Sequence, residues 1–151
     1  MTATCREACC SVKPRLTVSE LFERGYRRNR AAPLPIEGGP CIDAEGNTAR
    51  FSLDALGGKI ISVGFRATTC AALIAYCEYI AEIVPSFRLE IAKELTSAQL
   101  VARIPGVPPL KQNRAVLAIA AYRARLAAAL QPIATEEARN EGRLYLRHPA
   151  P

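Results

Sequence analysis

Cysteine is the residue type that offers most chemistry in this chain of 151 residues. Six cysteines stand at positions 5, 9, 10, 41, 70 and 77. The first residues contain no apolar stretch of about 7–15 residues, so no secretory signal is visible and the expected compartment is the reducing cytoplasm. The thiols are therefore expected to act as free thiols or ligands rather than as a disulfide framework.

Two of these cysteines have neighbours that suit metal or sulfur chemistry. Cys41 and Asp43 are two residues apart, so in an extended chain both side chains point to the same side. Cys70 stands where a predicted strand gives way to a predicted helix, and a helix N-terminus stabilises the metal-binding thiolate. A lone buried cysteine is more often a small apolar residue, so neither signal decides by itself.

Several other classes of function are excluded by composition. The single histidine, His148, rules out a multi-histidine metal centre, and the glycine-rich phosphate loops, the nucleophile elbow and the C-x-x-C pair are absent. The net charge of +6 suits an acidic partner, but no aromatic element for reading nucleic acid accompanies it. Arg123 and Arg125 interrupt the longest apolar run, so no membrane span is predicted.

The first half of the chain predicts a helix and a hairpin. A capping box at Thr17–Glu20 begins a helix that Gly25 is expected to end or loosen. Residues 48–56 and 59–68 alternate in hydropathy on either side of Gly57-Gly58, which predicts two antiparallel strands. The inward side chains are expected to be Ala49, Phe51, Leu53 and Ala55 on the first strand and Ile61, Val63 and Phe65 on the second.

The second half predicts only helices. Apolar residues follow helical spacing from residue 69 to Pro85. Short helices are predicted at 89–95 and 96–104, and a long helix is predicted to begin at Ala115 and end near Pro132. The charged tail after Thr135 is either a frayed helix or disordered. This order predicts an α+β domain over residues 16–134, with a small antiparallel sheet covered by helices, between a cysteine-containing arm (1–15) and a tail (135–151).

Four segments together resemble one known family. They are LFERGYRRNRAAPLP, GPCID, FRATTCAALIAYCEYIAEIV and VPPLKQNRAVLAIAAYRARL. In order and spacing they resemble the first helix and the three ligand segments of the IscU and NifU N-terminal family of iron–sulfur scaffold proteins, over roughly residues 17–131. The resemblance implies the same α+β fold.

The resemblance also implies a function. The chain would be a scaffold, not an enzyme, that binds iron or a labile [2Fe–2S] cluster and hands it to client proteins. Cys41 and Cys70 would be thiolate ligands, and Asp43 would be the carboxylate that helps to release the cluster. Lys111 would match the lysine of the Pro-Pro-x-Lys segment that an Hsp70-type chaperone binds in some members. A cysteine desulfurase is the other implied partner, and a homodimer is possible.

The chain departs from the family pattern at the third ligand. Asn113-Arg114 stands where the family has His-Cys, and Ile42 replaces the glycine between Cys41 and Asp43. An arginine cannot bind iron, because its guanidinium carries no lone pair for a metal. Two alternatives to the scaffold therefore stay open: a metal-free paralogue that acts as an interaction or adaptor subunit, and a zinc-binding sulfur-transfer protein.

The remaining cysteines and the histidine are the other residues whose types could replace the missing ligand. Cys77 lies seven residues after Cys70, about 10.5 Å further along a helix, so it is expected in the core. Cys5, Cys9 and Cys10 lie on an arm that could reach the site, bind zinc or copper by itself, or have no role. His148 is expected to be a solvated tail residue.

The last third of the domain is basic. Between Ser97 and Thr135 the chain has no acidic residue, and its five basic residues are Arg103, Lys111, Arg114, Arg123 and Arg125. Such a cluster is either a solvated helix face or a docking surface for an acidic partner such as the desulfurase. Lys111 and Arg114 are the predicted partner-binding residues.

Overall fold

The computed structural model describes residues 17–30 and 40–145, with side chains up to residue 130. Its elements follow the order α1 (Val18–Asn29), β1 (Cys41–Ile42), β2 (Thr48–Leu56), β3 (Lys59–Ala67), α2 (Ala71–Ile83), α3 (Leu89–Ala92), α4 (Ser97–Arg103), a 3₁₀ turn (Pro109–Lys111) and α5 (Arg114–Tyr145). The predicted α+β fold is confirmed. The arm cysteines Cys5, Cys9 and Cys10, and His148, lie outside the described residues. Within the described part, no helix is long and apolar enough to cross a bilayer.

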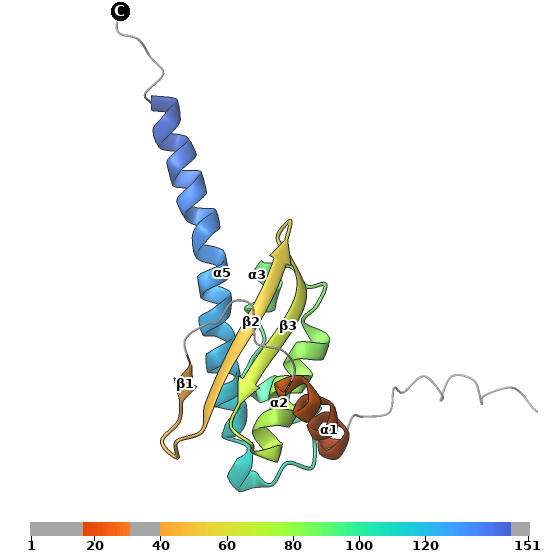
Figure 1. Cartoon of the computed structure of the whole chain (residues 1–151). Coiled ribbons are helices and arrows are strands. Elements are labelled where there is room, and N and C mark those ends of the chain that lie inside the picture. The colour runs from red at the N-terminus through yellow and green to blue at the C-terminus, as the bar shows by residue number, and fades with distance from the viewer. Residues whose placement is uncertain (1–16, 31–39, 146–151) are drawn as a thin grey trace, which may run out of the picture.

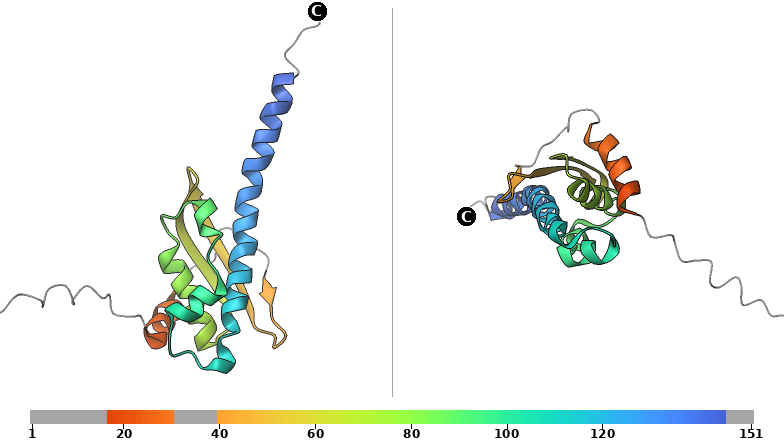
Figure 2. Two further views of the ribbon diagram at one scale, coloured as in Figure 1. Left: turned by 180° about the vertical axis from the view of Figure 1, so that it is seen from behind. Right: turned by 90° about the horizontal axis from the view of Figure 1, so that it is seen from below.

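The three strands form one antiparallel sheet in the order β1-β2-β3. Helices α2 and α5 cover one face of this sheet, and α1 lies at its edge against α2 (Figures 1 and 2). The core between the layers is built around Phe51, whose ring lies 5.9 Å from that of Tyr122 and 6.0 Å from that of Phe65. The buried Tyr122 hydroxyl donates to the carbonyl of Ala92 at 2.8 Å, which fixes α3 against α5.

The predicted hairpin is confirmed, but one of its inward faces is shifted. Gly57 and Gly58 both have positive φ, as a two-residue hairpin turn requires. The pairing then slips between Asp54 and Ala55, so that Ile60 rather than Ile61 faces the core. This β-bulge adds one residue to β3, and the side chain of Ile61 points to solvent. Ala55, predicted to face inward, is exposed at the same irregularity.

Gly25 does not end α1, which continues to Asn29. Gly25 instead lets α1 approach α2 closely, since a Cβ at this position would lie 2.6 Å from Cγ2 of Ile74 and 2.9 Å from Cβ of Glu78. The contact is reinforced by Arg28, whose Nε donates to the buried Glu78 carboxylate at 2.7 Å. The glycine therefore serves packing rather than helix termination.

The long helix also differs from expectation, because α5 does not end near Pro132 but continues to Tyr145. A proline inside a helix removes one backbone hydrogen bond and costs about 3 kcal/mol. The surrounding alanines and leucines have high helix propensity and offset that cost. The final turns of α5 project beyond the sheet and the other helices (Figure 1).

Gly25→Ala tests the close packing of α1 on α2. Alanine gains about 1 kcal/mol of helix propensity, but overpacking typically costs about 1–3 kcal/mol. Because the clash is with a Cβ and a branched side chain, we expect a net loss of roughly 1–2 kcal/mol in the free energy of unfolding, measured with urea. Glu23→Ala, at an exposed position of the same helix, is the control. Unchanged stability of Gly25→Ala would contradict the close approach.

Candidate functional site

The site begins at the turn between β1 and β2. One carboxylate oxygen of Asp43 accepts the backbone N–H groups of Glu45 and Asn47, each at 2.9 Å. The Asn47 side-chain amide donates to the other oxygen at 3.1 Å, and Gly46 turns the chain with a positive φ of 83°. Asp43 is therefore rigidly held, and its Oδ2 faces the start of α5.

Arg114, the first residue of α5, brings a cation to this carboxylate. Its guanidinium donates to Oδ2 of Asp43 at 3.2 Å and to Oε2 of Glu45 at 2.5 Å. A third hydrogen bond at 3.2 Å goes to the side-chain oxygen of Asn113. Only 2% of the Arg114 side chain is exposed. The residue in the position of the family's third cysteine is thus a buried, paired cation.

The Asp43 carboxylate and the Arg114 guanidinium shift each other's pKa. Partial desolvation raises the pKa of Asp43, but its hydrogen bonds from Asn47 and Glu45 and the charge of Arg114 outweigh this and hold the pKa below its usual value. Hydrogen bonding to Glu45 raises the pKa of Arg114; burial opposes this, and a hydrogen bond to Cys70 adds to it. Both groups are charged at neutral pH.

The two candidate thiols line different cavities beside the Asp43–Arg114 pair. Cys41 pairs with Ala49 across the sheet, is half-buried, and lines a cavity of about 550 Å³ together with Asp43 and Asn113. Cys70 is the N-cap of α2, as predicted, and lines a different cavity, of about 530 Å³, with Arg114. Cys41 and Cys70 therefore open onto separate cavities.

The residues present do not fit a metal ion or cluster at this position. Arg114 pairs with Asp43 and lines the same cavity as Cys70, so a metal held by Cys41, Asp43 and Cys70 would have to displace a buried guanidinium. Among the described residues, no group of three or more His, Cys, Asp or Glu side chains is arranged to hold a metal. The predicted ligand set stays a prediction, and the position of Arg114 argues against it.

The other predicted site residues divide between core and surface. Cys77 is fully buried, as expected, and burial raises the pKa of its thiol far above the usual range. Lys111 is exposed and follows Leu110, which is 89% exposed. The placement of Arg114 and Arg125 on a basic surface is wrong, because both are buried and Arg125 donates to the carbonyl of Leu53 at 3.1 Å.

Glu45 is the site residue that sequence reasoning missed. It lies two residues after Asp43, in a turn rich in residues that bond their own backbone, and no ligand or catalytic pattern marks it. One feature of the sequence could have pointed to Glu45. Arg114 replaces a cysteine in a segment expected to lie at the site, so its charge needs an acidic partner nearby. A buried arginine requires a carboxylate, and the turn supplies two.

Residues 44–132 contain the hairpin, α2, α3, α4 and the first part of α5. A family model described as NifU-like N terminal domain matches residues 44–132. The chain belongs to the NifU-like N-terminal domain family. The match includes Cys70 and Arg114 and begins one residue after Asp43. At the level of the family, this NifU-like domain is connected with iron–sulfur cluster assembly.

One similar solved structure is the crystal structure of a nitrogen-fixing NifU-like protein (N-terminal) from Brucella abortus. It is 18% identical in sequence, the alignment covers 73% of this chain and 81% of that chain, and the TM-score is 0.39. No curated protein matches this chain.

Because Asp43 is ionised in the folded protein, we expect its contribution to the free energy of unfolding to be lost in acid. Its folded pKa lies below the unfolded value of about 3.9, so its contribution is fully present above that pH and is lost as the pH falls through the folded pKa. We expect the difference in unfolding free energy between wild type and Asp43→Asn to be largest above about pH 4 and to shrink below it.

Urea unfolding at several pH values between 2.5 and 7 would measure this difference, with those limits set by the reference pKa of about 3.9. Asp54→Asn, which removes an exposed carboxylate from β2, controls for the general effect of losing a negative charge. A difference for Asp43→Asn that grows as the pH falls would contradict the arrangement around Arg114.

Proposed function

We propose that this chain acts in iron–sulfur cluster assembly as a metal-free, protein-binding member of the NifU-like family. The observation that carries the proposal is the buried guanidinium of Arg114, which pairs with Asp43 and Glu45 and lines the same cavity as Cys70. A fixed cation in this position supplies the positive charge that a metal would otherwise bring. The protein would act by binding, without catalytic turnover.

The proposed partners are those that the family resemblance implies, a cysteine desulfurase above all. Binding would use the surface that begins at the exposed Leu110 and Lys111, beside the Arg114 site. An apolar side chain next to a cation suits a partner with an apolar patch and nearby carboxylates. Arg114 would stabilise the site from within rather than contact the partner.

A second candidate, a carrier of iron or a labile [2Fe–2S] cluster, keeps one observation in its favour. Cys41 and Cys70 are both only half-buried and both line open cavities, so both thiols are accessible to a metal or a sulfur donor. In that case Arg114 would have to move away and another thiolate would have to complete the site. A zinc-binding sulfur-transfer protein would use the same thiols.

Restoring the family's residues tests the metal-free proposal. Protein purified without oxygen and supplied with iron and sulfide should retain neither as wild type. The double variant Asn113→His/Arg114→Cys should gain both, because it removes the guanidinium and supplies a third thiolate. Further Cys41→Ala or Cys70→Ala substitution should abolish the gain. Iron and acid-labile sulfide are measured per chain.

Asn113→His/Arg114→Met is the matched control, since it removes the guanidinium without adding a thiol. The cluster carrier would instead be established if the wild-type protein retained iron with equal sulfide and the Cys41→Ala and Cys70→Ala variants retained neither. Zinc without sulfide, lost in the same variants, would establish the sulfur-transfer protein.

Partner binding is tested with the cysteine desulfurase of the same organism. Wild type and the Cys41→Ala/Cys70→Ala variant should bind with equal affinity in calorimetry, because the proposal assigns the thiols no role in docking. Lys111→Glu should weaken binding severalfold and flatten its salt dependence. Lys59→Glu, at an exposed position beside the hairpin turn, is the control. Absence of binding in wild type would contradict the proposed partner.

A further inference from the structure

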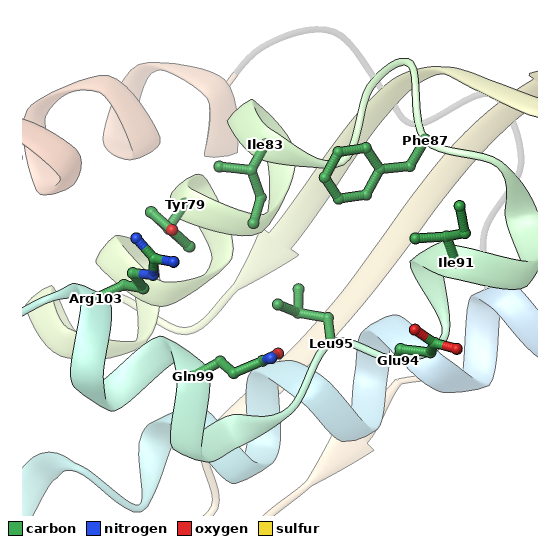
Figure 3. Close-up of a pocket in the computed structure, with 8 residues that line it drawn as sticks. All are labelled: Tyr79, Ile83, Phe87, Ile91, Glu94, Leu95, Gln99 and Arg103. Carbon is green, nitrogen blue, oxygen red and sulfur yellow. The ribbon is translucent and has the colours of Figure 1, made fainter. Parts of the chain in front are cut away.

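A second surface of the protein has the form of a binding groove and shares no residue with the Arg114 site. It lies between the end of α2, the segment that leads into α3, and α4 (Figure 3). Its volume is about 440 Å³, and its apolar lining consists of Ile83, Phe87, Ile91 and Leu95. That volume falls within the range of sites that bind other molecules, roughly 300–1,000 Å³.

The apolar lining is open to solvent. Ile91 is 55% exposed and Phe87 is 38% exposed, and Figure 3 shows both at the same side of the hollow. Scattered exposed apolar residues are common, but neighbouring large ones around a groove are typical of an interaction site. Burial of these side chains by a partner would supply about 25 cal/mol per Å² of apolar surface.

The groove is held in shape by strained backbone. Ser86, directly before Phe87, has a φ of 83°, a left-handed conformation that costs a non-glycine residue roughly 1–2 kcal/mol. Two hydrogen bonds to β3 hold the strained turn: Ser86 N–H to the Ile60 carbonyl at 2.8 Å, and Ile60 N–H to the Phe87 carbonyl at 2.9 Å. Phe87 is thereby fixed at the groove before any partner binds.

Opposite charges stand at the two ends of the groove. Arg103, in the last turn of α4, lies at one end, and Glu94 lies at the other (Figure 3). Both are exposed, and among the side chains of residues 17–30 and 40–130 neither has a hydrogen-bond or ion-pair partner. A ligand with a single charge would be attracted by one end and repelled by the other. The groove therefore suits an apolar segment that carries a carboxylate at one end and a cation at the other.

We propose that this groove docks an amphipathic helix of a partner protein, with its acidic first turn over Arg103 and its basic last turn over Glu94. Helices commonly carry acidic residues in the first turn and basic residues in the last, because these charges complement the helix dipole. Large apolar side chains one turn apart on that helix would contact Phe87 and Ile91, which is the helix-in-groove mode of recognition. The pre-shaped turn at Ser86 lowers the ordering cost of binding.

A designed peptide tests this docking site. The probe is a labelled, capped helical peptide with two glutamates in its first turn, leucines spaced three and four residues apart on one face, and two lysines in its last turn. It should bind the full chain in fluorescence anisotropy, and Ile91→Asp should weaken binding at least tenfold. Val116→Asp, an exposed valine on α5 away from the groove, should bind like wild type.

Charge exchange tests the orientation. A second peptide replaces the two glutamates by lysines. Wild type should prefer the glutamate peptide, and Arg103→Glu should reverse that preference; circular dichroism shows whether the folds of the variants are intact. Failure of wild type to bind either peptide, or equal binding of both by wild type and Arg103→Glu, would overturn the proposal. A dimer of the free chain that Ile91→Asp dissociates would overturn it too, since the groove's occupant would then be a second copy.

Discussion

At the candidate site, the ion pairs of Arg114 join two parts of the chain that are about 70 residues apart in sequence. Asp43 and Glu45 lie in the β1–β2 turn, and Arg114 begins the helix that covers the sheet. A buried guanidinium is tolerable only when carboxylates and hydrogen bonds compensate its lost hydration. The side chain of Arg114 therefore links the position of the turn to the position of the start of α5.

Several features of the fold followed from local sequence patterns. Turn chemistry and the period of apolar residues act over a few neighbouring positions, so they can be recognised in the sequence. They account for the hairpin at Gly57-Gly58, the helix start after Cys70 and the burial of Cys77. The family resemblance rested on the order of four such segments, and the match to the NifU-like model over residues 44–132 confirmed it.

Features that depend on contacts between distant elements could not be predicted in the same way. Gly25 resembled a helix end because the close approach of α2 is invisible in the sequence of α1. Ile61 was assigned to the wrong face because the alternation of apolar residues in the strand does not reveal the bulge that shifts Ile60 to the core. Arg114 resembled a surface cation because its partner Glu45 carried no motif.

The same fold thus presents two surfaces of different character. At one, a fixed cation lies among the residues that the family resemblance predicts as metal ligands, and the exposed Leu110 and Lys111 stand beside it. At the other, the strained turn at Ser86 holds an apolar groove open between opposite charges. Both are formed by contacts among this chain's own residues.

The most direct test is a crystal structure of the wild-type protein prepared without oxygen and exposed to iron and sulfide, with anomalous data collected at the iron edge. The account predicts the Arg114 guanidinium against Asp43 and Glu45 and no iron peak between Cys41 and Cys70. An iron peak bonded to the sulfurs of both cysteines, with Arg114 displaced from Asp43, would contradict it.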